Sequence, residues 1–402
     1  MERIYEKVLL EHAREYRQML FLAGPRQVGK TTTAKTIANQ STRSLYLNWD
    51  VQEHRRIILA GENKVAARCE FDTLSGGAET VIFDEIHKYP KWKLFLKGFF
   101  DLFADKCQII VTGSGHLNIF KSGGDSLMGR YFLYRMHPMS VAELLDQTLL
   151  ETEIRPPQKL SDKKFDTLLA FGGFPEPFMA ANKRFYNRWR RLRTDQLLRE
   201  DLRDLSRIQD IGQVEILAEN LIHQAGSLVN YSTLANSINV SVDTIRRWIR
   251  SLESLYFSFS IRPWSANIPK ALRKQPKIYL WDWSLIPDTG GRNENFIACH
   301  LLKAAQWWTD IGLGNYQLYF IRDKERREVD FLLTRDNQPW LLVEVKSSGK
   351  AVLSPHLARF QEKTGAVHAL QVAIDHDYVD GDCFSLHRPA IVPAKTFLSQ
   401  LI

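Results

Sequence analysis

The sequence predicts an α/β fold, with a doubly wound parallel sheet over residues 1–150. Three observations predict it: short apolar runs, polar residues at the end of each run, and helical or irregular stretches between them. The runs lie at 19–24, 44–50, 80–85, 107–115 and 132–140. Strands that alternate with helices form parallel sheets, and such sheets bind ligands at the carboxyl ends of their strands. We therefore expect a ligand site where these runs end.

Length and composition indicate a folded protein of several domains. A chain of 402 residues and 46.6 kDa exceeds one ordinary core. With 44% hydrophobic and 25% charged residues, it has neither the composition of a disordered protein nor an uninterrupted membrane-spanning run. Residues 151–164 are polar and contain two prolines, which is typical of a linker or a surface excursion. We expect three domains, over 1–150, 151–270 and 271–402.

Compartment and partners are only loosely constrained. The N-terminal residues mix charged and apolar positions and lack the pattern of a secretory signal, so we expect a cytoplasmic protein without membrane association. A formal charge of +8 permits a polyanionic partner. Basic residues cluster at 183–207 and predict a basic helix, most simply a solvated or subunit-facing one. The cysteines stand at wide spacings, which argues against a zinc knuckle or a disulfide framework: Cys69, Cys107, Cys299 and Cys383.

Residues 24–31 carry the clearest motif. They read G-P-R-Q-V-G-K-T and satisfy G-x-x-x-x-G-K-[ST], directly after a predicted strand and directly before a predicted helix. In such a loop, backbone N–H groups and the helix N-terminus surround a β-phosphate. Lys30 would reach the β- and γ-phosphates, and the Thr31 hydroxyl would ligate Mg²⁺. The predicted ATP-binding residues are Gly24, Pro25, Arg26, Gln27, Val28, Gly29, Lys30, Thr31 and Thr32.

The run at 80–85 ends in two carboxylates, about fifty residues after the phosphate-binding loop. Phosphoryl transfer depends on positioning and charge, so a metal and an attacking water both need acidic partners at the end of a neighbouring strand. We predict that Asp84 holds Mg²⁺ and that Glu85 orients or polarises the water. A buried strand that ends in two carboxylates has no obvious structural purpose otherwise.

Two further residues are candidates for the same site. The run at 107–115 places Thr112 and Ser114 at its end, and Ser114 is the predicted sensor of the γ-phosphate. The alternative is that small polar residues simply end strands well. Arg130 is a candidate finger that would act in a neighbouring protomer, and an ordinary surface or intramolecular salt bridge is its alternative role.

Together these segments resemble the prokaryotic AAA+ (AAA-type) ATPases that carry a C-terminal domain of unknown function. The resemblance covers nearly the entire chain and rests on residues 24–32, 81–101, 109–115, 126–144 and 171–178. Residues 87–90 read HKYP where many relatives have glutamine and valine, and glycine follows Ser114; neither departure touches a phosphate-contacting position. The resemblance implies an AAA+ α/β core, ATP hydrolysis and a homo-oligomer, and it leaves the substrate open.

A second constellation lies in the last third of the chain. Glu294 starts a predicted helix, Asp330 lies in a predicted strand, and Glu344 and Lys346 stand two apart on the next strand, so their side chains share a face. Such carboxylates can hold Mg²⁺, and a lysine can activate water for phosphodiester attack. The pattern resembles the PD-(D/E)XK nuclease-like fold at Asp330 and at Glu344-Val-Lys346, with Glu294 as the helical carboxylate. A cross-strand salt bridge is the alternative.

Residues 230–264 resemble a winged helix. They predict a short helix, a turn near Asn239, a longer amphipathic helix and an apolar β-like tail. This segment would either bind DNA or dock the ATPase domain onto the C-terminal domain. The residues predicted for the exposed face of a recognition helix are Ser241, Asp243, Arg246, Arg247 and Arg250. Their neighbours with helical spacing are predicted to be core residues: Trp248, Ile249 and Leu252.

Three functional hypotheses fit these motifs. The first is an ATP-hydrolysing switch or remodeller that uses ATP and Mg²⁺ and acts on DNA or RNA. The second is an ATP-regulated nuclease that cuts at Asp330, Glu344 and Lys346. The third is a scaffold that holds protein partners and uses ATP only as a conformational latch. Salt dependence separates the third from the others, because phosphate contacts weaken steeply as salt rises.

Overall fold

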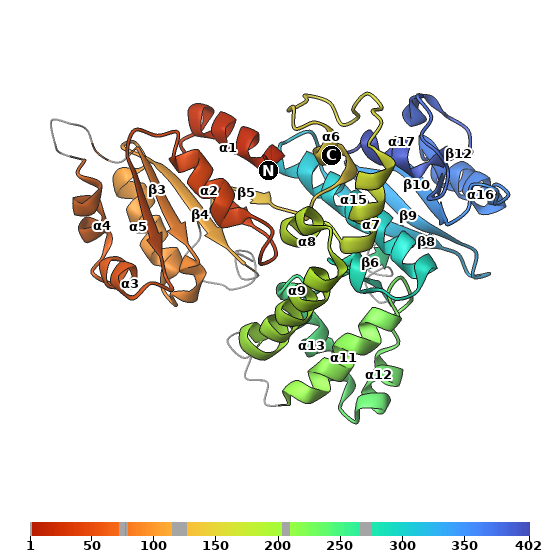
Figure 1. Cartoon of the computed structure of the whole chain (residues 1–402), viewed down its shortest axis with the longest axis horizontal. Helices are drawn as coiled ribbons and strands as arrows, with labels where there is room; N and C mark the ends of the chain where they lie inside the picture. The colour runs from red at the N-terminus through yellow and green to blue at the C-terminus, as the bar shows by residue number, and fades with distance from the viewer. Residues whose placement is uncertain (1, 72–76, 78, 115–126, 203–209, 266–274) are drawn as a thin grey trace. The chain divides into compact units, whose positions relative to one another are not determined.

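The chain folds into two compact units (Figure 1). The computed structural model describes residues 2–71, 77, 79–114, 127–202, 210–265 and 275–402. The first unit comprises Met1–His137 and Gln147–Leu149, and the second comprises Pro138–Asp146 and Leu150–Ile402. The second unit holds both the predicted helical region and the predicted C-terminal domain. The division of the chain into three domains stays a prediction.

Parallel strands form the centre of the first unit. Within the described residues of this unit, five strands make one sheet in the order β2-β3-β4-β1-β5, and every neighbouring pair is parallel. The predicted apolar runs supply them, which confirms the α/β fold class of this part of the chain. The strands are β1 (Met19–Ala23), β2 (Ser44–Asn48), β3 (Thr80–Asp84), β4 (Gln108–Gly113) and β5 (Tyr131–Arg135).

Helices cover both faces of this sheet. Side chains alternate between the faces of a strand, and on one face Phe21, Phe83 and Val111 join an apolar core with residues of α3, α4 and α5. The opposite face carries Leu20 and Ile82, which are also fully buried. Figure 1 shows α1 and α2 on the other side of the sheet from α3, α4 and α5. The helices are α1 (Ile4–Glu15), α2 (Lys30–Ala38), α3 (Gln52–Leu59), α4 (Glu62–Cys69) and α5 (Trp92–Phe103).

The second unit begins with short helices. Asn239, with φ of 61°, ends one of them in the left-handed conformation that asparagine tolerates, at the predicted turn. The side chains of Asn230 and Ser241 cap α12 and α13 by accepting backbone N–H groups. The helices are α6 (Val141–Leu145), α7 (Asp162–Phe171), α8 (Pro175–Ala180), α9 (Lys183–Asp195) with the π-helical turn η2 (Gln196–Asp201), α11 (Ile211–His223), α12 (Tyr231–Ile238) and α13 (Val242–Ser254).

A mixed sheet follows these helices. Among the described residues its seven strands run in the order β12-β11-β10-β9-β8-β6-β7. Within it, β8, β9 and β10 form a meander, because each pairs antiparallel with the next along the chain. The strands are β6 (Ser258–Pro263), β7 (Lys277–Leu280), β8 (Tyr316–Arg322), β9 (Glu328–Arg335), β10 (Gln338–Lys346), β11 (His368–Ala373) and β12 (Ala390–Pro393). The helices among them are α15 (Thr289–Asp310), α16 (Pro355–Thr364) and α17 (Ala394–Ser399).

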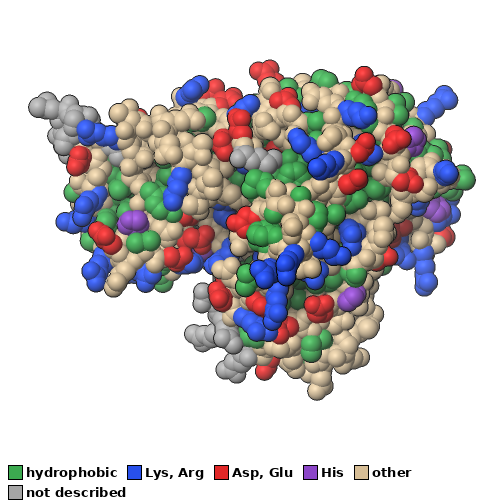
Figure 2. Space-filling model, in the orientation of Figure 1, with side chains coloured by type: hydrophobic (Ala, Val, Ile, Leu, Met, Phe, Trp, Pro, Cys, Tyr) green, Lys and Arg blue, Asp and Glu red, His purple; other side chains and the backbone are tan. Residues whose placement is uncertain are grey.

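Lys and Arg side chains gather over α9, as Figure 2 shows. Lys183, Arg184, Arg188, Arg190 and Arg191 are exposed there. Residues 183–202 are helical, which agrees with the helix predicted at 183–207. Residues 203–207 lie outside the described part of the chain. No helix in the described part of the chain combines the length and the apolar character needed to cross a bilayer.

The segment predicted as a linker or a surface excursion, residues 151–164, is mostly exposed and is anchored by a few residues. Arg155 and Leu160 are buried, and the backbone of Arg155 exchanges two hydrogen bonds with Gln400, one from its N–H to the Gln400 carbonyl and one to its carbonyl from the Gln400 side-chain amide. The Gln158 N–H donates to the Ser399 hydroxyl at 3.1 Å. Its prolines and polar residues are typical of a linker, but its hydrogen-bond partners, Ser399 and Gln400, lie near the C-terminal end of the chain.

The cysteines are free thiols, and all four are buried. Cys69 and Cys107 belong to the first unit, and Cys299 and Cys383 belong to the second. Burial raises the pKa of Cys69, Cys107 and Cys383 to about 12, and it raises the pKa of Cys299 as well. A buried thiol with a raised pKa is unreactive, because the thiolate is the nucleophile.

A buried ion pair fixes α6 within the second unit. Lys303 of α15 donates to Glu143 of α6, and the two side chains are 1% and 0% exposed. The same ammonium donates to the Ser140 hydroxyl at 2.8 Å. Nearby, the Val141 N–H donates to Nε2 of His300 at 3.2 Å. Burial lowers the pKa of His300 to about 3, so its ring is neutral and can accept this bond.

We predict that Lys303→Met lowers the free energy of unfolding by about 3–5 kcal/mol, because it leaves the Glu143 carboxylate buried without its counterion. Urea unfolding followed by tryptophan fluorescence measures the loss. The double variant Lys303→Met/Glu143→Leu should recover most of it, because an apolar pair leaves no buried charge. A single variant as stable as the wild type would contradict this role of the pair.

Candidate active site

The loop between β1 and α2 is shaped by its two glycines. A Cβ on Gly24 would lie 2.3 Å from the carbonyl oxygen of Met136, so only glycine fits against that backbone. Gly29 has φ of 109°, in the left-handed region that favours glycine, and it is the residue before α2. The loop therefore turns sharply into the N-terminus of a helix, where backbone N–H groups are free to bind an anion.

Lys30 lies inside this loop. Its Nζ donates to the carbonyl oxygens of Gly24 at 2.8 Å and Pro25 at 2.7 Å. Burial lowers the pKa of Lys30 to about 8, and the nearby carboxylates of Glu85 and Asp84 oppose that shift. Burial thus makes the protonated form of Lys30 less stable than that of an exposed lysine. A bound anion would stabilise the protonated form and raise the pKa again.

Asp84 accepts hydrogen bonds from several residues of the site. It is the last residue of β3 and lies in register with Asn48 on β2 and Thr112 on β4. Thr31 donates to Asp84 Oδ2 at 3.0 Å, and the Tyr46 hydroxyl donates to the same oxygen at 2.6 Å. Thr112 donates to Oδ1. The parallel register brings these side chains to one edge of the sheet, next to the first turn of α2.

Glu85 follows Asp84 in a strained conformation. Its φ is 55°, in the left-handed region, where residues other than glycine are uncommon and often functional. The Ser114 hydroxyl donates to Glu85 Oε2 at 3.3 Å, and His87 Nε2 lies 3.6 Å from the same oxygen. Burial raises the pKa of Glu85, while Lys30 and Lys88 lower it. The carboxylate is therefore more basic than an exposed glutamate, as a base for water requires.

The predicted residues of the first site thus largely converge. Lys30, Thr31, Asp84, Glu85 and Ser114 share one edge of the sheet, whereas Gln27 and Thr32 are exposed. Of the two hydroxyls on β4 and its end, Thr112 contacts Asp84 and Ser114 contacts Glu85. The remaining predicted loop residues, Pro25, Arg26 and Val28, complete the turn between β1 and α2.

Arg130 lies apart from this group, on the approach to β5. Its guanidinium donates to both oxygens of Asp101 in α5, at 2.7 and 3.1 Å. The two side chains are 27% and 43% exposed. An intramolecular salt bridge was the alternative role for this residue, and a finger role would require it to leave Asp101.

Arg3 and Tyr46 are among the residues of the site that sequence reasoning missed. Arg3, directly before α1, is buried and donates to the carbonyl oxygens of Val28 and His137, each at 2.7 Å. It therefore joins the phosphate-binding loop to the chain after β5. Tyr46 was missed as well, although it lies two residues before the polar end of β2 and its side chain shares the face of Asn48. Arg3 gave no sequence signal, because its partners are backbone atoms far along the chain.

The second predicted constellation also converges, around an unpredicted lysine. Lys277 Nζ lies 3.2 Å from Glu294, 2.7 Å from Glu328 and 3.9 Å from Asp330. Burial alone would lower the pKa of Lys277, but the three carboxylates outweigh it and raise that pKa. Within the described residues, no group of three or more acidic, histidine or cysteine side chains is arranged to hold a metal ion.

The other members of this cluster lie on β9 and β10. Asp330 accepts the Val345 N–H at 2.8 Å, and Lys346 donates to Glu344 at 2.8 Å. Burial and the neighbouring carboxylates of Glu294 and Glu344 raise the pKa of Asp330. The four predicted residues, Glu294, Asp330, Glu344 and Lys346, thus occupy one site, and a lysine ammonium already neutralises part of its charge.

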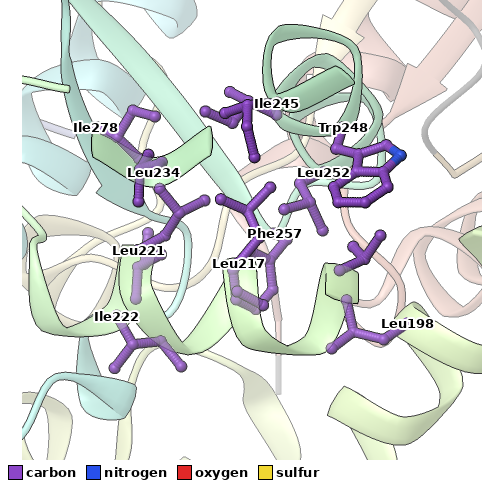
Figure 3. Close-up of a cluster of buried hydrophobic side chains, with 14 of the residues drawn as sticks. Leu198, Leu217, Leu221, Ile222, Leu234, Ile245, Trp248, Leu252, Phe257 and Ile278 are labelled. Carbon is purple, nitrogen blue, oxygen red and sulfur yellow. The ribbon is translucent and has the colours of Figure 1, made fainter. Parts of the chain in front are cut away.

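The residues predicted on α13 separate as expected into two faces. Trp248, Ile249 and Leu252 are buried in the core that Figure 3 shows. Asp243, Arg246, Arg247 and Arg250 are exposed, and Ser241 accepts the Thr244 N–H as the helix cap.

Comparison with known proteins assigns the first unit. Residues 16–145 match the family model of an AAA domain, and this stretch contains the phosphate-binding loop, Asp84 and Glu85. This stretch is therefore similar to AAA-type P-loop ATPase domains. Later in the sequence, residues 162–294 and 289–388 match two domains of unknown function, DUF8612 and DUF4143. The resemblance predicted from the sequence is confirmed for the ATPase part.

Individual relatives are distant. An uncharacterized protein of Mycobacterium tuberculosis is 24% identical over 332 residues, which cover 80% of this chain and 69% of that protein. The Walker-type ATPase of Pyrococcus abyssi is 15% identical, with a TM-score of 0.43, over 70% of this chain and 93% of that one. AMPPCP-bound DnaA from Aquifex aeolicus is 16% identical, with a TM-score of 0.32, over 62% and 86%.

We predict that ATP binds more weakly as pH rises above about 8, because the pKa of Lys30 is lowered to about 8 and the phosphates require its protonated form. Once deprotonation dominates, the dissociation constant should rise about tenfold per pH unit. Titration with a fluorescent ATP analogue between about pH 7 and about pH 9.5 measures it. Lys30→Arg keeps its charge over this range, so its affinity should stay flat. A flat wild-type curve would refute the role of this proton.

Proposed function

We propose that this chain is an ATP-hydrolysing switch or remodeller that acts on nucleic acid. The observation that carries the proposal is the arrangement of Asp84 and Glu85 at the mouth of the phosphate-binding loop, with Thr31 bonded to Asp84 and Ser114 bonded to Glu85. This arrangement supports the proposal, because phosphoryl transfer needs oxygen ligands for a metal ion beside a carboxylate that can orient water.

The AAA domain's own residues supply distinct parts of this chemistry. The loop backbone and Lys30 bind and orient the phosphates of ATP. Thr31 and Asp84 fit a Mg²⁺ ion, because both are oxygen donors and lie within hydrogen-bond distance of each other. When bound, Mg²⁺ supplies charge that stabilises the transferring phosphoryl group. Glu85 orients the attacking water and accepts its proton, and Ser114 fixes the carboxylate of Glu85.

Further features of the proposal extend beyond one protomer. We infer a cytoplasmic homo-oligomer in which Arg130 leaves Asp101 and neutralises charge in a neighbouring protomer's site. Nucleic acid as the partner is supported by the exposed arginines of α9 and α13. The chain order of α11, α12, α13, β6 and β7, with Leu228 paired to Lys277, supports a winged-helix module as the element that binds it.

We predict that Glu85→Gln lowers kcat for ATP hydrolysis by about 100-fold or more and leaves ATP affinity within a few fold, because the amide keeps the shape but cannot accept the proton. Steady-state phosphate release and nucleotide titration measure the two effects. Glu53→Gln, which removes an exposed carboxylate of α3, is the control and should act as the wild type. A Glu85→Gln protein that hydrolyses ATP at the wild-type rate would remove Glu85 as the base.

A second candidate function is metal-dependent phosphodiester cleavage at the C-terminal cluster, as in the PD-(D/E)XK nuclease-like fold. One observation favours it: Glu344 Oε2 is buried and accepts no hydrogen bond from the described residues, so it could bind a cation. Lys277 works against it, because its ammonium lies where a metal would balance the carboxylates. We therefore place this function second, and we infer that the cluster is held together by Lys277.

Replacing Lys277 tests this choice. We predict that Lys277→Met lowers the free energy of unfolding by about 1–3 kcal/mol and that Mn²⁺ restores part of it, because the partly buried carboxylates then lack a cation. Thermal melts with and without Mn²⁺, in the absence of nucleotide, measure both effects. Lys324→Met, which changes an exposed lysine between β8 and β9, should show neither. If wild-type protein is stabilised by Mn²⁺ and cleaves DNA, and Glu344→Ala abolishes both, the nuclease function takes first place.

A further inference from the structure

A hollow opens on the surface of the second unit, beside α12, α13 and β6. Its volume is about 600 Å³, within the range of small-molecule sites. Of the described residues that line it, three are arginines and one is acidic: Arg246, Arg250 and Arg262, and Glu253. Tyr231 and Asn230, from the start of α12, contribute further polar groups. We call this feature the arginine hollow.

The amphipathic character of α13 forces two of the arginines into this place. Ile245, Trp248 and Leu252 point into the core, as Figure 3 shows, so the opposite side of the helix must be polar. Arg246 and Arg250 stand four residues apart and share one side of the helix. Arg247, one residue along, is exposed but does not line the hollow.

The third arginine comes from a neighbouring strand. In β6, Ile261 and Pro263 are buried while Arg262 between them is exposed. Strand alternation therefore turns this side chain away from the core and toward α13. The fold thus brings residues 246, 250 and 262 to one hollow from two separate elements.

Positive charge dominates the arginine hollow. Glu253 accepts a hydrogen bond from Ser260, which partly satisfies its carboxylate. Asp243 lies 3.6 Å from Arg246, but its side chain is 92% exposed and screened by water. Arg250 forms no salt bridge with any described residue. The guanidinium of Arg246 lies over the Tyr231 ring, 5.3 Å from its centre, which holds it at the rim.

Tyr231 lines the same hollow as the three arginines, and its pKa is affected by their charges. Burial and Glu253 raise the pKa of this hydroxyl, while Arg262, Arg246 and Arg250 each lower it. All three charges therefore reach the Tyr231 oxygen, although they come from different elements.

We propose that the arginine hollow binds a phosphate group. Guanidinium groups offer paired N–H donors that match phosphate oxygens, and donors converge here from α12, α13 and β6. A planar carboxylate presents two oxygens in one plane, whereas a tetrahedral phosphate can accept from several directions at once. Tyr231 and Asn230 lie at the edge of the hollow and could contact the group that the phosphate carries. The site is independent of ATP hydrolysis in the AAA domain.

Two sources can supply this phosphate: the backbone of a nucleic acid, and a free phosphate or phosphate ester. The first would use the hollow to hold a strand next to α13, and the second would make it a small-molecule site. Binding of either phosphate source requires Arg246 and Arg250. The two sources are distinguished by which probe binds at the hollow, a DNA duplex or inorganic phosphate.

The test compares Arg246→Ala, Arg250→Ala and the matched control Arg247→Ala in the full chain, with the ATPase site saturated by a non-hydrolysable ATP analogue. One arm titrates a labelled DNA duplex at several salt concentrations. The other measures thermal stabilisation by inorganic phosphate against chloride at equal ionic strength. ATP hydrolysis is measured on the same preparations without the analogue and should be unchanged in all three variants, so failure of the ATPase proposal is seen separately.

If the hollow holds a nucleic-acid backbone, Arg246→Ala and Arg250→Ala weaken DNA binding about tenfold each and lower the salt slope by about one, whereas Arg247→Ala has a smaller effect. If it holds a free phosphate, the two variants lose the phosphate-induced stabilisation and bind DNA as Arg247→Ala does. The proposal is overturned if wild type responds to neither probe, or if all three variants respond alike while circular dichroism shows them folded.

Discussion

The buried carboxylate of Asp84 is the constraint on which the first unit depends. A charged oxygen pair at the end of a buried strand must be satisfied by neighbours, and here the neighbours come from β2, β4 and α2. The parallel register that aligns Asn48, Asp84 and Thr112 is therefore also the register that builds the site. Fold and site are specified by the same hydrogen bonds, so a slip of one residue between these strands would break both.

The second unit satisfies its carboxylates in another way. Its partly buried carboxylates Glu294 and Asp330 lie beside the ammonium of Lys277 rather than a set of hydroxyls. Hydroxyl donors leave the charge of Asp84 available to a cation, whereas a lysine consumes it. The two clusters both contain carboxylates, but the second also contains a lysine ammonium that neutralises part of its charge.

Sequence reasoning recovered the elements whose signals are local. The phosphate-binding loop, the acidic end of β3 and the amphipathic α13 each follow from a few adjacent residues, and the structure has them in place. Arg3, Tyr46 and Lys277 were missed, because their partners lie far along the chain and only the fold brings them together. The segment around Arg155 was predicted as a linker or a surface excursion, and most of it is exposed, but its hydrogen bonds to Gln400 have no local signal in the sequence. The arginines of α13 were found, and only the structure separates Arg247 from its neighbours.

The distribution of the thiols gives each unit its own reporter. Cys69 and Cys107 lie inside the first unit and Cys299 and Cys383 inside the second, all shielded from solvent. A thiol reagent can reach them only when the surrounding structure opens, so the labelling rate of each cysteine measures the opening of its own unit. Mass spectrometry of the labelled peptides would therefore read the two local stabilities separately in one unmodified chain, and nucleotide could be added to learn which unit it protects.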